Sequence, residues 1–162
     1  MRSVLFVCSV VLLSVSTAWA GDKLAVQWDC AVPAPNHMIE ASDQPGHVYS
    51  ISQVKCTAAS GEIAGVKQKE GVGTEFHELK GTADRFHGVF VETLANGDKI
   101  TYTYEGTATV EGGKLKSATN KWSATSGTGG FKSIKASGSC SAAPKPDGTT
   151  KFDCSGDYSI PK

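Results

Sequence analysis

Short runs of β-forming residues alternate with glycine-containing turns through most of the second half of the chain. From residue 86 onward the turns recur at a spacing of about eight to twelve residues, and helical patterns are hard to find. This spacing is typical of antiparallel sandwiches and barrels. About eight strands fit the whole chain, and a closed sheet of about that size encloses side chains or one small ligand. The sequence therefore predicts an all-β fold, an antiparallel eight-stranded barrel.

The first twenty residues have the features of a secretory leader. The stretch MRSVLFVCSVVLLSVSTAWA carries a positive charge at Arg2, then an apolar run, then a small-x-small ending. The apolar run is shorter than the roughly 20 residues that a membrane-spanning helix needs. We therefore expect a signal peptide over residues 1–20, a single domain over residues 21–162, and a secreted or periplasmic protein with no stable membrane anchor.

The charge of the chain is balanced. Without Arg2, fifteen Lys and Arg stand against sixteen Asp and Glu, with the two signs mixed along the sequence. Nucleic acids and anionic membrane surfaces are bound by basic stripes or patches. We therefore expect neither as a partner.

Four cysteines follow the leader: Cys30, Cys56, Cys140 and Cys154. An even number in an exported chain indicates two disulfides, and the absence of a C-x-x-C motif or a Cys/His cluster argues against a metal site. A turn is expected at the KPDG sequence, residues 145–148. If this turn is centred on its aspartate, Cys140 lies directly opposite Cys154, within reach of a disulfide. Cys30 is then left to pair with Cys56.

The stretch FHGVFVETL-ANGD-KITYTYEG forms the clearest hairpin, because an Asn-Gly dipeptide tolerates the two positive φ angles of a two-residue turn. Such a turn places Val91 opposite Tyr102. Side chains alternate along a strand, so His87 lies on the same inward face. We expect this face to line the barrel and to bind a ligand through Val89, Val91, Ile100, Tyr102 and Tyr104.

The opposite face of this hairpin carries Phe90. The next hairpin turns at Gly112-Gly113 and places Val110 opposite Leu115, and uninterrupted alternation from there puts Trp122 on the outer surface. Exposed aromatic residues carry much of the binding energy of protein interfaces. Trp122 and Phe90 are therefore candidate contacts for a homo-oligomer or a partner protein.

The first half of the chain gives a coarser prediction. Two strands, KLAVQWDCAV and HVYSISQVKC, flank a proline-rich loop over residues 33–47 that contains His37 and His47. Two further strands are expected near Glu62–Gln68 and Thr74–Leu79.

The glycine-rich stretch SGTGGFKSIKASGSC, residues 126–140, is a turn that enters a strand. A phosphate-binding loop of the G-x-x-x-x-G-K-[ST] type has a lysine directly after its last glycine, but here Phe131 follows Gly130. The apolar spacing through Phe131 and Ile134 predicts a strand instead of the helix that such a loop precedes. Nucleotide binding is therefore not expected.

The succession KWSATSGTGGFKSIKASGSCSAAP-KPDGTTKFDCSGDYSI resembles the C-terminal half of the allene oxide cyclase and dirigent-type barrels. In that superfamily a Gly-x-Gly-x-Phe turn leads into a strand, a glycine-containing hairpin follows, and the last strand ends near an aromatic residue. The resemblance covers roughly Ile100 to Ile160. It implies a calycin-like barrel, often oligomeric, whose pocket shapes a reactive ligand. No catalytic position is transferred to this chain.

Three titratable residues are candidates for proton transfer, and each is also explained as an ordinary strand residue. Glu75 and His77 are two apart and share a strand face, whereas Glu78 lies on the other side. His87 lies beside the inward tyrosines, where burial would adjust its pKa. No G-x-S-x-G motif indicates a hydrolase.

Three functions remain open. The first is an exported binding protein that holds a small apolar or aromatic molecule in the barrel, with no cofactor and no catalysis. The second is a cyclase or dirigent-like isomerase, which requires a charged or histidine side chain deep in the same cavity. The third is an exported inhibitor or adhesin that acts through an exposed aromatic patch at Trp122 and Phe90.

Overall fold

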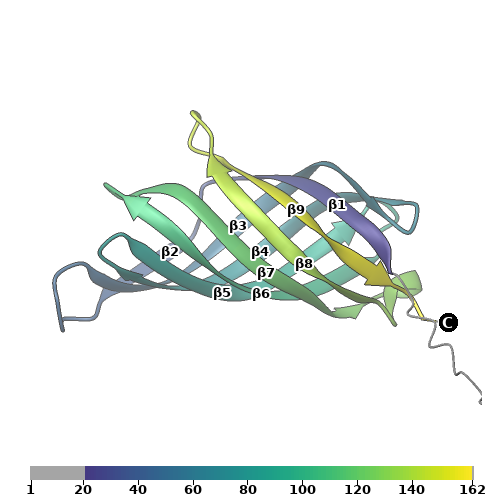
Figure 1. Ribbon diagram of the computed structural model, residues 1–162, viewed down its shortest axis with the longest axis horizontal. Helices are drawn as coiled ribbons and strands as arrows, with labels where there is room; N and C mark the ends of the chain where they lie inside the picture. Colours follow the sequence, from purple (N-terminus) through teal and green to yellow (C-terminus); the bar gives the residue numbers. More distant parts are fainter. Residues whose placement is uncertain (1–20, 162) are drawn as a thin grey trace, which may run out of the picture.

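The computed structural model describes residues 21–161, which form one continuous β-sheet (Figure 1). The strands in chain order are β1 (Asp22–Cys30), β2 (Asn36–Glu40), β3 (His47–Ile63), β4 (Val66–Lys80), β5 (Ala83–Leu94), β6 (Lys99–Glu111), β7 (Lys114–Gly127), β8 (Lys135–Pro144) and β9 (Thr150–Ser159). Within these residues the one helical element is a 3-10 turn, η1 (Gly129–Phe131). The signal peptide expected over residues 1–20 lies outside the described residues.

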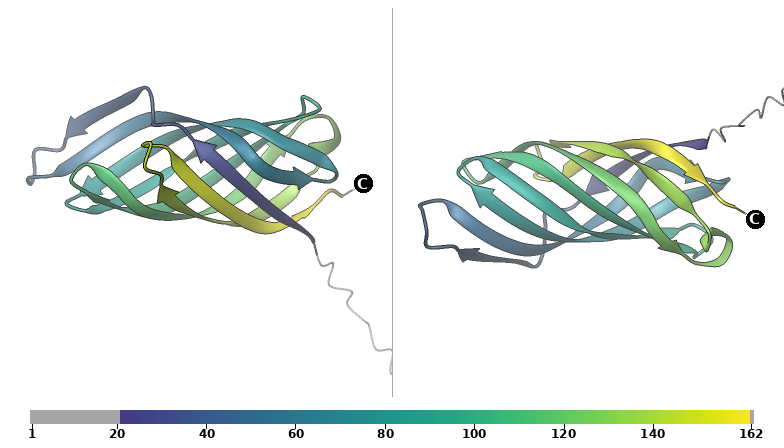
Figure 2. Two further views of the ribbon diagram at one scale, coloured as in Figure 1. Left: turned by 90° about the horizontal axis from the view of Figure 1, so that it is seen from above. Right: turned by 60° about the horizontal axis from the view of Figure 1, so that its bottom comes forward.

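The sheet closes on itself. Neighbouring strands pair antiparallel in the order β1-β9-β8-β7-β6-β5-β4-β3-β2, and β1 also pairs with β3. This last pairing joins eight strands into a barrel, while β2 pairs with β3 outside the ring (Figure 2). The predicted all-β, eight-stranded antiparallel barrel is therefore confirmed. Among residues 21–161, no helix is long and apolar enough to span a membrane.

Both predicted disulfides are present. Cys140 lies directly opposite Cys154 in the β8–β9 hairpin, as the turn-centred register predicts. Cys30 lies opposite Cys56, across the β1–β3 pairing that closes the barrel. One disulfide therefore crosslinks the C-terminal hairpin, and the other crosslinks β1 to β3 where the barrel closes.

The register predicted for the β5–β6 hairpin is wrong by one residue. The loop holds three residues, because the Leu94 amide donates a hydrogen bond to the Asp98 carbonyl and Gly97 adopts φ +88°. A shift of one residue turns every side chain of a strand to the other face of the sheet. Val89 and Val91 consequently lie on the outer surface, 39% and 37% exposed, and His87 lies there with them. Phe90 faces the interior, opposite Tyr102.

The predicted position of Trp122 is also wrong. Val110 does lie opposite Leu115, but Thr109 lies opposite Ser117, so that β7 carries one extra residue at this point. A β-bulge of this kind interrupts the alternation of side chains along the strand. Trp122 therefore faces the interior and is only 9% exposed. The aromatic surface patch expected at Trp122 and Phe90 does not form.

The remaining segments follow the prediction in part. The strand expected over Glu62–Gln68 is split by a turn at Ala64-Gly65, between β3 and β4. The loop at 33–47 contains the short strand β2. The glycine-rich stretch is a turn, as predicted, although Phe131 belongs to η1 and the strand begins only at Lys135.

One end of the barrel, the end at which the C-terminus lies in Figure 1, is packed shut. Its buried side chains, which we call the closed end, are Leu24, Ile63, Leu94, Ile100, Tyr102, Trp122, Phe131, Ile134 and Ala136. Ile63, Leu94 and Ile100 have 0–1% of their surface exposed. At the opposite end the interior is more accessible to solvent, as the 21% exposure of the His77 side chain shows. We call the group of Glu75, His77 and Asp84 at this end the mouth.

Candidate functional site

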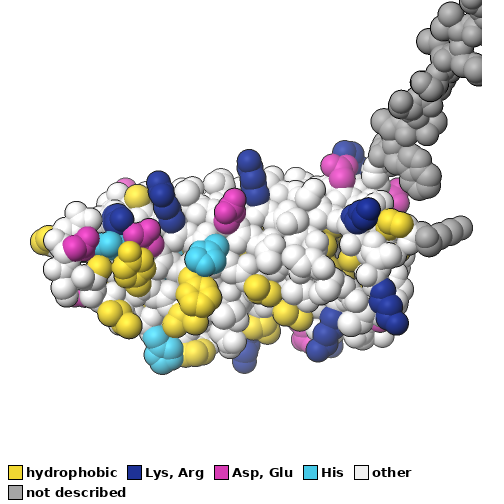
Figure 3. Space-filling view, turned by 90° about the horizontal axis from the view of Figure 1, so that it is seen from below, with side chains coloured by type: hydrophobic (Ala, Val, Ile, Leu, Met, Phe, Trp, Pro, Cys, Tyr) yellow, Lys and Arg dark blue, Asp and Glu magenta, His cyan; other side chains and the backbone are white. Residues whose placement is uncertain are grey.

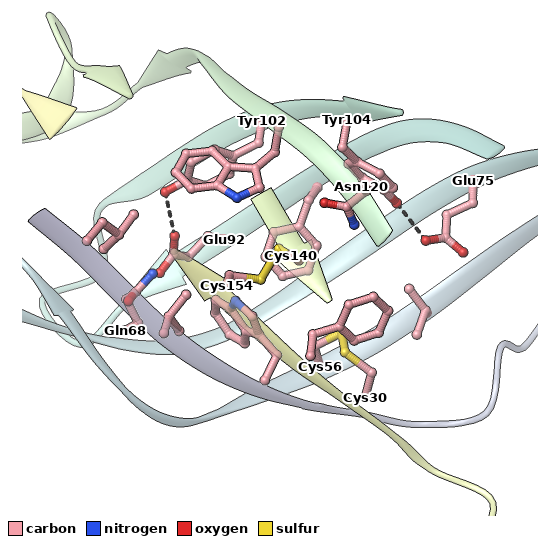
Figure 4. Close-up of a pocket in the computed structure, with 17 residues that line it drawn as sticks. Cys30, Cys56, Gln68, Glu75, Glu92, Tyr102, Tyr104, Asn120, Cys140 and Cys154 are labelled. Atoms are coloured by element: carbon pink, nitrogen blue, oxygen red, sulfur yellow. Dashed lines mark hydrogen bonds between the residues drawn. A yellow bond between two sulfur atoms is a disulfide. The ribbon is translucent and has the colours of Figure 1, made fainter. Parts of the chain in front are cut away.

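An interior cavity of ≈ 90 Å³ lies between the closed end and the mouth (Figure 4). Apolar and aromatic residues make up most of its wall, and both disulfides contribute to it. The lining residues are Leu24, Val26, Trp28, Cys30, Val54, Cys56, Gln68, Glu75, Phe90, Glu92, Tyr102, Tyr104, Asn120, Trp122, Cys140, Phe152 and Cys154.

The aromatic side chains are held by contacts with one another. The Phe90 ring packs edge-on against Trp28, with centroids 5.1 Å apart, and the Tyr102 ring packs edge-on against Trp122 at 5.5 Å. Phe90 lies over Gly71, where an added Cβ would come within 2.1 Å of the ring. Any larger residue at position 71 would push Phe90 into the cavity. The space inside the barrel therefore depends on this glycine as well as on the large residues.

A single carboxyl group, Glu92, lies at the side of the cavity that adjoins the closed end. Glu92 has no exposed surface, and its strand partner is Ile100. The Tyr102 hydroxyl donates a hydrogen bond of 2.8 Å to Glu92 Oε2, while Oε1 has no partner (Figure 4). Burial raises the pKa of Glu92 to about 7, although the hydrogen bond from Tyr102 and the nearby Gln68 side chain favour the charged form. Glu92 can therefore exchange a proton near neutral pH.

A chain of hydrogen bonds runs from the mouth to the cavity wall. His77 Nδ1 lies 2.8 Å from Asp84 Oδ2, and His77 Nε2 lies 3.2 Å from Glu75 Oε2. The Tyr104 hydroxyl donates to Glu75 Oε1 at 2.9 Å (Figure 4). Burial lowers the pKa of His77, but the bonds to Asp84 and Glu75 outweigh it and raise the pKa to about 9. At neutral pH the mouth therefore holds an imidazolium between two carboxylates.

The predicted site residues divide into three groups. Tyr102 and Tyr104 line the cavity. Glu75 and His77 share a strand face as predicted, and this face points into the barrel instead of forming a solvated strand edge. Ile100 is fully buried, but it packs in the closed end and not against the cavity. Val89, Val91 and His87 lie on the outer surface, where His87 stacks on Phe76 with ring centroids 5.4 Å apart. The ligand-lining role expected of Val89 and Val91, and the interior position of His87, are therefore wrong.

Sequence reasoning missed the residues that most distinguish the cavity, which are Glu92, Phe90, Trp122 and Asn120. All four were missed because of the two register errors, which placed each residue on the outer face or left it unassigned. A signal in the turn could have placed Glu92 and Phe90 correctly. Ala95, Asn96 and Gly97 also fit a three-residue hairpin loop, which favours glycine at its last position. No comparable signal marks the bulge in β7.

Exposed apolar side chains gather on the outer face of β2–β5 (Figure 3). Cross-strand pairs make this face continuous, because Ile39 lies opposite Tyr49 and Ile51 lies opposite Phe76. We call this group the outer patch; its members are Ile39, Tyr49, Ile51, Val72, Phe76, Val89 and Val91. It takes the place of the patch that the sequence predicts at Trp122 and Phe90.

Comparison with known proteins does not add a family to this description. No protein-family model matches the chain, and no curated protein matches it at a significant level. Within residues 21–161, no group of three or more His, Cys, Asp or Glu side chains is arranged to hold a metal ion. The geometry of the barrel is therefore the evidence for its function.

Proposed function

We propose that the barrel binds a small, largely apolar molecule in its interior cavity. The observation that carries the proposal is the empty space between Trp28, Phe90 and Trp122, in a barrel whose other end is packed shut. Binding sites for small molecules are concave, mostly apolar and lined by a few well-placed polar groups. The cavity has this composition, since Gln68, Glu75, Glu92 and Asn120 are the polar exceptions apart from the tyrosines.

The size of the cavity limits the ligand. An engineered cavity of about 150 Å³ accommodates benzene, and drug-sized ligands occupy about 300–1,000 Å³. At ≈ 90 Å³ the space suits a compact molecule of a few non-hydrogen atoms. A longer ligand would place only one end here and would extend past Tyr104 toward the mouth.

An isomerase is the second candidate, and Glu92 is the observation that favours it. A ligand-shaping enzyme needs a proton-transfer group deep in the cavity, and a carboxyl with a pKa of about 7 suits this task. The likeness to allene oxide cyclase and dirigent barrels remains a proposal, to which the family comparisons add no support. Turnover of a bound ligand that Glu92→Gln abolishes without weakening binding would establish this alternative.

Export is the compartment that we propose for this protein. Two disulfides, Cys30–Cys56 and Cys140–Cys154, persist in an oxidising environment and are rare in the cytosol. The leader-like first twenty residues support the same compartment. Mass spectrometry of the mature protein from its native host tests this proposal, with Gly21 as the expected N-terminus and four protons fewer than the reduced mass.

The cavity proposal is tested by blocking the space. The wild-type protein is titrated with 1-butanol, cyclopentane and phenol, and ¹H–¹⁵N spectra follow the indole N–H signals of Trp28 and Trp122. Val54→Phe fills the cavity, and Val91→Phe makes the same change on the outer face. We expect probe-dependent shifts in the wild type and in Val91→Phe but not in Val54→Phe. Absence of shifts for all three probes, or equal shifts in folded Val54→Phe, would contradict the proposal.

A further inference from the structure

The charged groups that line the cavity are all acidic. Glu75 and Glu92 contribute carboxyl groups, and none of the lining residues is Lys, Arg or His. The mouth holds the His77 imidazolium, whose two ring nitrogens already contact Asp84 and Glu75. The positive charge of His77 is therefore balanced by these two carboxyl groups at the mouth.

The two carboxyl groups differ in what they still lack. Glu75 accepts a hydrogen bond from Tyr104 at Oε1 and contacts His77 at Oε2, so both of its oxygens are engaged. Glu92 has a partner only at Oε2, and its Oε1 is buried without one. A buried carboxyl with an unpartnered oxygen is costly, and the cost falls when a positive charge or a hydrogen-bond donor reaches it.

Acceptors without donors predominate around the cavity. Side-chain oxygens of Gln68, Glu92 and Asn120 are buried and lack a hydrogen-bond partner, against a single unpartnered donor, Trp122 Nε1. An ammonium group supplies up to three N–H donors and no acceptor. A carboxylate ligand would instead add acceptors to a site that already has too many.

The aromatic wall favours the same charge. The faces of aromatic rings attract cations, most strongly when the cation is removed from water, and Trp is the best of them. Trp28, Phe90, Tyr102 and Trp122 all line the cavity that Glu92 adjoins. An ammonium ion at Glu92 would therefore have a carboxylate on one side and aromatic rings around it.

We propose that the ligand of this cavity is a small organic ammonium ion, bound with its N–H groups on Glu92 Oε1 and its short apolar part against the aromatic wall. This inference rests on the proposed function, because it specifies the chemistry of the molecule that the cavity binds. The volume of ≈ 90 Å³ limits the apolar part to a few carbon atoms. Fatty acids and other anionic ligands are excluded by the same carboxyl groups.

The test compares three ligands of equal length and different charge. n-Butylammonium, 1-butanol and butanoate are titrated at pH 7.5 into the wild-type protein, Glu92→Gln and Glu105→Gln, with the Trp122 indole N–H signal as the readout. Glu92→Gln is nearly isosteric and removes the charge, and Glu105→Gln makes the same change at an exposed position. We expect the wild type and Glu105→Gln to bind n-butylammonium about tenfold or more tightly than 1-butanol, with butanoate weakest. In Glu92→Gln the preference for the ammonium ion should vanish.

Two results would overturn the inference and leave the proposed function intact. The first is equal binding of 1-butanol and n-butylammonium by the wild type, and the second is an ammonium preference that survives in Glu92→Gln. If none of the three ligands binds, the cation inference fails. The cyclopentane and phenol titrations then decide separately whether the cavity binds small molecules.

Discussion

The carboxyl groups at the two ends of the cavity differ in their burial and their hydrogen bonds. At the mouth, Glu75 is partly hydrated and both oxygens are engaged by Tyr104 and His77. Next to the closed end, Glu92 is fully buried with one oxygen free, and its pKa is raised to about 7. The same functional group is thus stabilised as a structural ion pair in one place and left available in the other. A buried polar atom without a partner calls for an explanation, and at Glu92 the proposed ligand supplies one.

A leucine-to-alanine substitution at each end should give the largest difference in the free energy of unfolding. Leu94→Ala at the closed end removes a side chain that is 1% exposed, and we expect a loss of about 2–5 kcal/mol in the free energy of unfolding. Leu79→Ala near the mouth removes a half-buried side chain and should cost less than half as much. Urea denaturation measures both values. Equal losses would contradict the view that only one end is packed shut.

Phe90→Ala tests the register that places the cavity wall. Phe90 packs against Trp28 inside the barrel, so its removal should lower the free energy of unfolding by about 3 kcal/mol. Val91→Ala, one residue further on the outer face, should change it by less than about 1 kcal/mol. A larger loss for Val91→Ala than for Phe90→Ala would instead support the two-residue turn, which places Glu92 on the outer face.

Glu92→Gln should make the protein more stable at neutral pH. The folded-state pKa of about 7 lies above the usual value of 4.5, so the wild type loses stability as pH rises from 4.5 through 7. The variant lacks this loss and should gain up to about 3 kcal/mol at pH 8, with no difference at pH 4. Denaturation over this pH range provides the measurement. A variant that is less stable than the wild type at pH 8 would show that Glu92 supports the fold.

His77→Gln should have a smaller effect of the opposite sign. The folded-state pKa of about 9 exceeds the usual 6.5, so the imidazolium stabilises the fold below pH 6.5 and this contribution disappears as pH rises through 9. Because the side chain is 21% exposed, we expect a loss of only about 1–2 kcal/mol at pH 6. His87→Gln on the outer face is the control, since it leaves the contacts of His77 in place. Equal losses at pH 6 and pH 10 would contradict the ion-pair account.

The fold could be predicted from the sequence because its evidence is local. Turn residues such as Lys145–Gly148 fix the β8–β9 register, and that register alone pairs Cys140 with Cys154. The even number of cysteines then leaves one other disulfide. Regular turn spacing and the lack of helical periodicity give the barrel.

The site could be predicted only in part, because it depends on which way each side chain faces. One extra residue in the β5–β6 loop moved Val89 and Val91 outward and brought Glu92 inward. The bulge in β7 did the same for Trp122. A one-residue shift changes little in the turn propensity of a sequence, yet it exchanges the two faces of a whole strand. Tyr102 and Tyr104 were assigned correctly because β6 keeps the predicted alternation.

A crystal structure under xenon pressure tests the central claim most directly, because xenon enters apolar cavities and scatters strongly. We expect a xenon atom between Trp28, Phe90 and Trp122, with the closed-end side chains Ile100 and Phe131 unmoved. A barrel whose aromatic rings fill this space and that takes up no xenon would contradict the claim that the interior is a binding cavity.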